Sequence, residues 1–91
     1  MKTDVEILSE VTNCAVVRLP ERRFPGVVVQ GDTLKSWELT AHEIVDALEK
    51  GDFADARETA AHLYETLQGR VREYEEVLVA HRIDLPYVKE G

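Results

Sequence analysis

The first thirty residues carry short apolar runs that favour β-strands. Apolar and polar positions alternate over residues 4–8, and further apolar runs cover 14–19 and 27–30. The first two runs are separated by a short polar link, which is typical of antiparallel neighbours. We therefore predict a three-stranded antiparallel meander. Val5 and Ile7 are expected to face the core, and the valine run 27–29 is expected to be buried on both faces or central in the sheet.

After Gly31 the apolar spacing changes from two residues to 3 and 4, which predicts helices over 34–50 and 53–82. Asp32 or Thr33 is expected to cap the first helix. Gly51 suits the left-handed end of that helix, and Asp52 is expected to cap the next one at once. A link this short makes the two helices an antiparallel hairpin. The predicted fold class is α+β, a meander followed by a helical hairpin, in a single domain over residues 1–91.

The second predicted helix is too long for a compact chain of this size. Thirty helical residues span about 45 Å, whereas a compact chain of this length is roughly 30 Å across. We expect this helix to overhang, to bend at Gly69, or to pack on another protein. Its expected partner interface consists of Leu67, Val71, Tyr74 and Leu78. The segment 84–91 is read as an extended tail that folds back on the core or adds an edge strand.

Charge narrows the class of partner. Eighteen acidic and eleven basic residues give a net charge of −7, which repels nucleic acid and anionic membranes and attracts a basic protein. No apolar run approaches the roughly 20 residues needed to cross a bilayer, and the N-terminus lacks the apolar region of a secretory signal. Cys14 is the only cysteine. We expect a cytoplasmic protein in which Cys14 is buried and inert.

The sequence carries none of the common catalytic or nucleotide-binding motifs. We therefore predict that the protein is not an enzyme and has no cofactor. His42 with Asp46, and Glu58 with His62, each share a helix face, and a divalent metal between these pairs is one interpretation. Charged, solvated helix faces produce such pairs by chance, so we predict no metal site.

One positive cluster stands out in this acidic chain. Arg18, Arg22 and Arg23 lie within six residues, beside Phe24. One interpretation is a loop that grips a carboxylate or phosphate, with Phe24 as an apolar anchor. The other is a solvated turn whose arginines offset nearby acids. The candidate loop site is Arg18, Arg22, Arg23, Phe24, Gln30 and Asp32.

Two resemblances centre on the same loop. The run PGVVVQGDTL before an amphipathic helix resembles HicB-type antitoxins, whose small α+β domain blocks a ribonuclease toxin. More of the chain, from Asn13 through Gln30-Gly31-Asp32 to Leu85-Pro86-Tyr87, is similar to small uncharacterised bacterial proteins with an Arg-x-Phe-Pro-Gly-Val-Val-x-Gln-Gly-Asp core. The first resemblance implies an antitoxin-like role, and the second implies no function.

Three functional hypotheses follow. The leading one is a protein-binding module, antitoxin-like or immunity-like, that neutralises a basic protein partner. The second is a structural or regulatory homodimer assembled through the second helix. The third is a small-ligand or metal site at the loop between Arg22 and Asp32.

Overall fold

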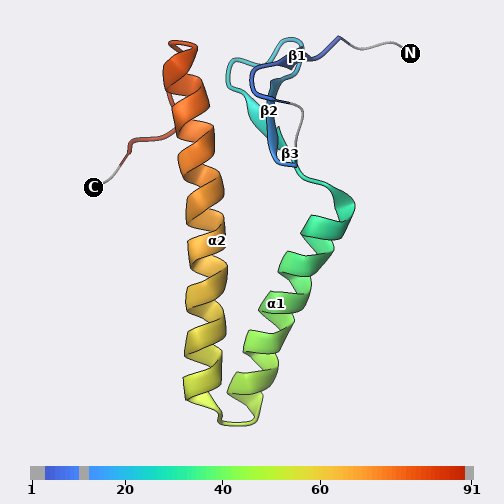
Figure 1. Cartoon of the computed structure of the whole chain (residues 1–91), viewed down its shortest axis with the longest axis vertical. Helices are drawn as coiled ribbons and strands as arrows, with labels where there is room; N and C mark the ends of the chain where they lie inside the picture. Colours follow the sequence, from blue (N-terminus) through green and yellow to red (C-terminus); the bar gives the residue numbers. More distant parts are fainter. Residues whose placement is uncertain (1–3, 11–12, 90–91) are drawn as a thin grey trace. The chain divides into compact units, whose positions relative to one another are not determined.

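The computed structural model describes residues 4–10 and 13–89 and confirms the α+β class. Three short strands come first: β1 (Glu6–Ile7), β2 (Ala15–Arg18) and β3 (Gly26–Val28). Two helices follow, α1 (Gly31–Glu49) and α2 (Phe53–Ala80) (Figure 1). The α2 helix is continuous through Gly69.

The chain divides into two compact units. Residues 30–70 form one unit, called here the hairpin unit. Residues 1–29 and 71–91 form the other, called the sheet unit. Helix α2 belongs to both, because its first part lies in the hairpin unit and its last ten residues lie in the sheet unit. The single domain predicted from chain length therefore consists of two units.

The sheet has the order β1-β2-β3, with antiparallel pairing throughout. Its register pairs Ile7 with Val17, and Val16 with Val27. Central burial of the valine run 27–29 was predicted, and this is wrong, since β3 is an edge strand with exposed side chains. The central strand is β2, where Ala15, Val16 and Val17 are all buried.

The prediction of which residues of the first strand face the core is also wrong. Val5 and Ile7 are exposed, and Leu8 is the residue that enters the core. The Leu8 amide donates to the Val16 carbonyl at 2.9 Å, which aligns Leu8 with Val16. Because side chains alternate along a strand, this alignment turns Ile7 to the other face of the sheet.

The core of the sheet unit is built on the last part of α2. Leu8, Val16, Tyr74 and Leu78 form its buried cluster, and Leu78 has no exposed surface. The Tyr74 hydroxyl donates to the Pro25 carbonyl at 2.7 Å, which fixes the turn before β3 to the helix. The His81 Nε2 atom lies 2.8 Å from the Leu8 carbonyl. The helix therefore contacts the chain at the end of β1 and at the turn between β2 and β3.

Helix α2 ends at Ala80, two residues before the predicted boundary. The Ile83 amide bonds the Leu78 carbonyl and the Arg82 amide bonds the Val79 carbonyl, while Arg82 takes a left-handed conformation with φ of 58°. These are the two hydrogen bonds of a Schellman C-cap.

The tail after α2 folds back on the sheet unit. Ile83 and Leu85 pack against the core, and the Tyr87 hydroxyl donates to Glu75 at 3.1 Å. Residues 90–91 of the predicted tail lie outside the described residues.

Helix α1 begins three residues before the predicted start. Gln30 occupies the N-cap position in an extended conformation, without a side-chain cap. Asp32 therefore lies in the first turn, where its carboxylate accepts from the Thr33 amide at 2.9 Å. The predicted cap at Asp32 or Thr33 is wrong, although a carboxylate in the first turn still favours the helix through its dipole.

Candidate functional site

The turn between α1 and α2 is fixed by backbone hydrogen bonds. The Asp52 amide donates to the Ala47 carbonyl at 2.9 Å and the Gly51 amide donates to the Leu48 carbonyl at 3.1 Å. Gly51 has φ of +75°, a conformation that suits glycine. The Asp52 carboxylate then accepts from the Asp55 amide at 3.1 Å and caps α2. The predicted turn and the predicted Asp52 cap are both confirmed.

The less exposed residues of each helix mark the side that faces the other helix in the hairpin unit. They follow spacings of 4 and 3, which is the pattern of an antiparallel helix seam. In α1 this seam contains Thr33, Trp37, Thr40, Ile44 and Ala47, and in α2 it contains Ala56, Thr59, Leu63, Thr66 and Arg70. Four threonines, two alanines and an arginine make it a poor source of apolar contact.

A second apolar stripe lies next to this seam on both helices, and it is exposed. We call it the apolar face: Leu34, Ala41, Val45 and Leu48 of α1, with Ala60, Tyr64, Leu67 and Phe53 of α2. Phe53 is 69% exposed, Tyr64 65% and Leu34 60%. Within residues 30–70, all of which the structure describes, only Ala47 and Ala56 are buried.

Both stripes lie on the same side of the hairpin. Seven of the eight residues of the face directly follow a seam residue; for example, Val45 follows Ile44 and Tyr64 follows Leu63. Each step of one residue along a helix is a rotation of about 100° around the helix axis. Because α1 and α2 run in opposite directions, this rotation places the stripe of α1 and the stripe of α2 on the same side of the hairpin.

The two helices of the hairpin are closest at the turn. Figure 1 shows α1 and the first part of α2 close together at the turn and diverging away from it. The two buried alanines, Ala47 and Ala56, lie near the turn. At the open end, Leu34 and Trp37 line a pocket of about 590 Å³ together with Gly31, Lys35 and Glu38.

The exposed surface is large for so small a unit. The six large side chains of the apolar face leave about 600 Å² of apolar area uncovered. At about 25 cal/mol per Å², covering it would release about 15 kcal/mol before the costs of association. That is comparable with the whole stability of a typical small domain, about 5–15 kcal/mol. The face is therefore large in comparison with the apolar patches of typical monomeric proteins.

Acidic groups gather near the turn. A pocket of about 290 Å³ is lined by Glu43, Asp46, Asp52 and Asp55, with Lys50 as its only cation. The Lys50 ammonium lies 2.9 Å from the Asp46 carboxylate. Their hydrogen bond and attraction lower the pKa of Asp46 and raise the pKa of Lys50. The remaining carboxylates leave this end of the hairpin negative.

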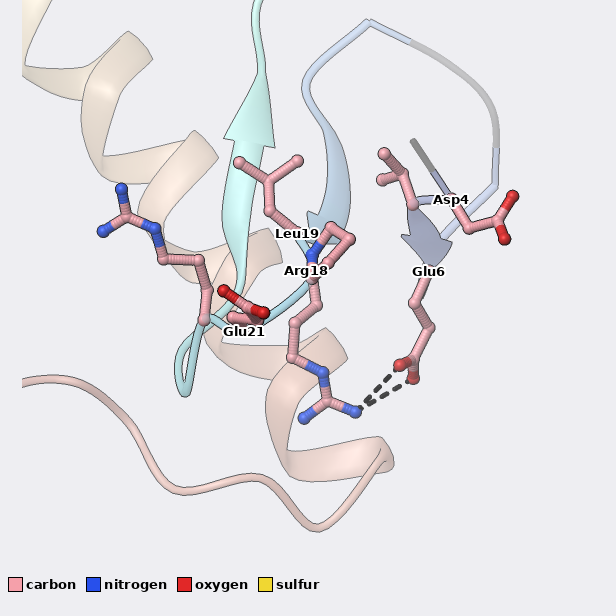
Figure 2. Close-up of a pocket in the computed structure, with 8 residues that line it drawn as sticks. Asp4, Glu6, Arg18, Leu19 and Glu21 are labelled. Carbon is pink, nitrogen blue, oxygen red and sulfur yellow. Dashed lines mark hydrogen bonds and ion pairs between the residues drawn. The ribbon is translucent and has the colours of Figure 1, made fainter. Parts of the chain in front are cut away.

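The predicted arginine loop divides into separate contacts. Arg18 is paired with Glu6, because one of its guanidinium nitrogens lies 3.0 Å from both carboxylate oxygens (Figure 2). The Arg23 guanidinium stacks on the Phe24 ring at 4.9 Å. Gln30 and Asp32 belong to the hairpin unit, at the start of α1.

Arg18 and Arg22 do line one pocket of the sheet unit, with a volume of about 380 Å³. Asp4, Glu6 and Glu21 line the same pocket (Figure 2). These three carboxylates outnumber the two arginines, so the pocket disfavours an anionic ligand.

The four residues predicted as the helix interface have different environments. Tyr74 and Leu78 are buried in the core of the sheet unit, so they are not available to a partner. Leu67 and Val71 are exposed, in the hairpin unit and the sheet unit respectively. The interface predicted from the sequence did not include Tyr64 or any residue of α1. Tyr64 lies four residues after Ala60 and three before Leu67, a spacing that could have revealed it.

Neither a metal site nor a membrane span is found among residues 4–10 and 13–89. No group of three or more His, Cys, Asp or Glu side chains in this part of the chain is arranged to hold a metal ion. None of the described helices combines the length and the apolar character that a bilayer requires.

Comparisons with known proteins identify a family for this chain, but the function of that family is unknown. A search of the curated proteins and a search of the solved structures each found no match. A model of a family of unknown function, DUF6959, matches residues 1–87. The chain therefore belongs to this family.

Proposed function

We propose that this protein is a small, acidic, non-catalytic protein-binding module whose docking surface is the apolar face of the hairpin. The observation that carries the proposal is the burial pattern of residues 30–70, where two alanines are the only buried residues. An apolar face of this size, flanked by polar residues, is a common feature of protein interaction sites. A helical hairpin with an exposed apolar side suits recognition of another helical surface.

The charge of the chain favours a basic protein as the heterologous partner. The net charge is −7, and the carboxylates of Glu43, Asp46, Asp52 and Asp55 concentrate negative charge near the turn. Such a surface accelerates encounter with a basic protein and suppresses binding to nucleic acid. In its sharpest form the module is a cytoplasmic, antitoxin-like or immunity-like protein that neutralises a basic partner, in line with the resemblance of PGVVVQGDTL to HicB-type antitoxins.

A matched pair of leucines tests this function. Leu48 and Leu39 are both on α1 and both 49% exposed, but they are nine residues apart and so lie on opposite sides of the helix. The tagged full chain and its Leu48→Glu and Leu39→Glu variants are used to capture polypeptides from cells that also express an untagged copy. We expect the wild type and Leu39→Glu to retain the same polypeptides, and Leu48→Glu to lose them.

Two results would contradict the proposal. One is capture of the same polypeptides by all three proteins, which would show that the apolar face is not the docking surface. The other is capture of none, including the untagged copy. The basic character of a heterologous partner is tested by salt, because steering between opposite charges weakens as ionic strength rises.

A further inference from the structure

We propose that the apolar face of the hairpin is covered by the same face of a second copy of this chain. The two hairpins would form a two-fold symmetric dimer with a four-helix bundle at its centre. This inference rests on the proposed function, since it names the partner of the same docking surface. Two observations favour a second copy: the dimensions of the face and the absence of a core in the hairpin unit.

The dimensions of the face match those of its own copy. The stripe on α1 runs from Leu34 to Leu48 and the stripe on α2 runs from Phe53 to Leu67, so each covers fourteen residue steps. Both are about 21 Å long. Two such faces would bury about 1,200 Å² through their large side chains alone, which is at the lower bound of a stable protein interface. The alanines and the polar rim add to this area.

The acidic groups near the turn stay outside this interface. Asp46 and Asp55 directly precede the seam residues Ala47 and Ala56, whereas the apolar face follows the seam. These carboxylates therefore lie on the opposite side of the hairpin from the apolar face and would not approach their own copies in the dimer.

The lack of a core explains why the partner is a second copy. A hairpin whose buried residues are two alanines has little tertiary packing to hold its helices, and helices in proteins depend on such packing. The partner must therefore be present whenever the chain folds, which a second copy always is. The acidic pocket beside Asp46 and Asp55 lies near the turn, on the side of the hairpin opposite the apolar face, and would stay available to a basic protein.

Sedimentation equilibrium of the full chain tests the inference. We expect the wild type to have twice the mass of the 10.3 kDa chain at 10 μM. We expect Leu48→Glu to raise the dimer dissociation constant at least 100-fold, because each dimer would bury two added carboxylates. Leu39→Glu is the matched control and should leave the dissociation constant within a factor of three. A monomeric wild type at 100 μM, or equal effects of the two variants, would overturn the proposal.

Failure of the dimer and failure of the proposed function have different signatures. In a monomeric wild type, rapid hydrogen exchange of the α1 amides would overturn the dimer alone, because the hairpin would still lack a covering partner. Slow exchange of the same amides in a monomer would overturn both, since the chain would then cover its own apolar face.

Discussion

The two units use the same kind of helix pattern in opposite ways. In the sheet unit, Tyr74 and Leu78 of α2 are buried beneath Leu8 and Val16. In the hairpin unit, the same helix exposes Phe53, Tyr64 and Leu67, and its partner α1 exposes Leu34, Val45 and Leu48. Apolar residues at spacings of 3 and 4 are thus a core in one unit and an open surface in the other.

The difference shows what stabilises each unit. The sheet unit has strands, a tail and a turn packed around its part of α2, so long-range contacts hold it. The hairpin unit is held by the backbone bonds at Gly51 and the cap at Asp52, which act locally. Substitutions should therefore act through packing in the first unit and through backbone conformation in the second.

The largest expected effect is at Leu78. Leu78→Ala removes a side chain with 0% exposure and should lower the free energy of unfolding by about 2–5 kcal/mol. Leu39→Ala, at a position that is 49% exposed, should change it by no more than about 0.5 kcal/mol. Urea denaturation of the full chain measures both. Equal losses would remove the distinction between the two units.

Tyr74→Phe should have the next largest effect. It deletes the buried donor to the Pro25 carbonyl, and we expect a loss of about 1–2 kcal/mol at neutral pH. Burial raises the pKa of Tyr74 above its ordinary value. The stability that neutral Tyr74 supplies is therefore complete below about pH 10 and is lost as the pH rises through its folded-state pKa.

The pH dependence gives a check within the same experiment. The stability difference between the wild type and Tyr74→Phe should shrink above about pH 10. Urea titrations from pH 8 to pH 11 measure it. A difference that stays constant across this range would contradict the burial of the Tyr74 hydroxyl.

Alanine substitutions at two glycines of the hairpin unit should change the free energy of unfolding in opposite directions. Gly51→Ala forces a side chain into φ of +75° at the turn and should cost about 1 kcal/mol. Gly69→Ala lies inside α2, where an added Cβ would meet nothing within 4 Å, and should stabilise by about 0.5–1 kcal/mol. Thermal unfolding followed by circular dichroism measures both. A loss in both variants would show that packing, not backbone conformation, limits the hairpin.

The smallest effect is expected at the surface ion pair. Glu6→Gln weakens the contact with Arg18, whose side chain is 31% exposed while that of Glu6 is 54% exposed. Such pairs contribute at most about 1 kcal/mol, and we expect a loss near the lower end of that range. A loss above 2 kcal/mol in urea denaturation would show that this pair supports the fold.

The sequence predicted the order of the elements because each has a strong local signal. The change of spacing at Gly31 marked the passage from strands to helices, and Lys50-Gly51-Asp52 marked the turn between helices. Three predictions failed because apolar spacing alone does not contain the information that they needed. The alternation at Val5 and Ile7 indicated two faces of a strand but not which face is covered, and the valines after Pro25 did not reveal that β3 is an edge strand. The first helix was predicted to be capped by Asp32 or Thr33, whereas Gln30 is its N-cap.

The candidate site was predicted only in part, for the same reason. Leu67 was chosen as an interface residue and is exposed, but Tyr74 and Leu78 share its stripe and are buried. Apolar spacing identifies a stripe along a helix, whereas the covering element is known only from the fold. The arginine cluster was visible in the sequence, but its neutralisation by Glu6 depends on strand register.

Hydrogen exchange of the wild type, Leu48→Glu and Leu39→Glu tests most directly whether another chain covers the hairpin. At equal protein concentration, Leu48→Glu should lose at least tenfold protection at the amides of α1, while the amides around Leu78 keep theirs. Leu39→Glu should behave as the wild type at both places. Unchanged protection of α1 in Leu48→Glu would contradict the account.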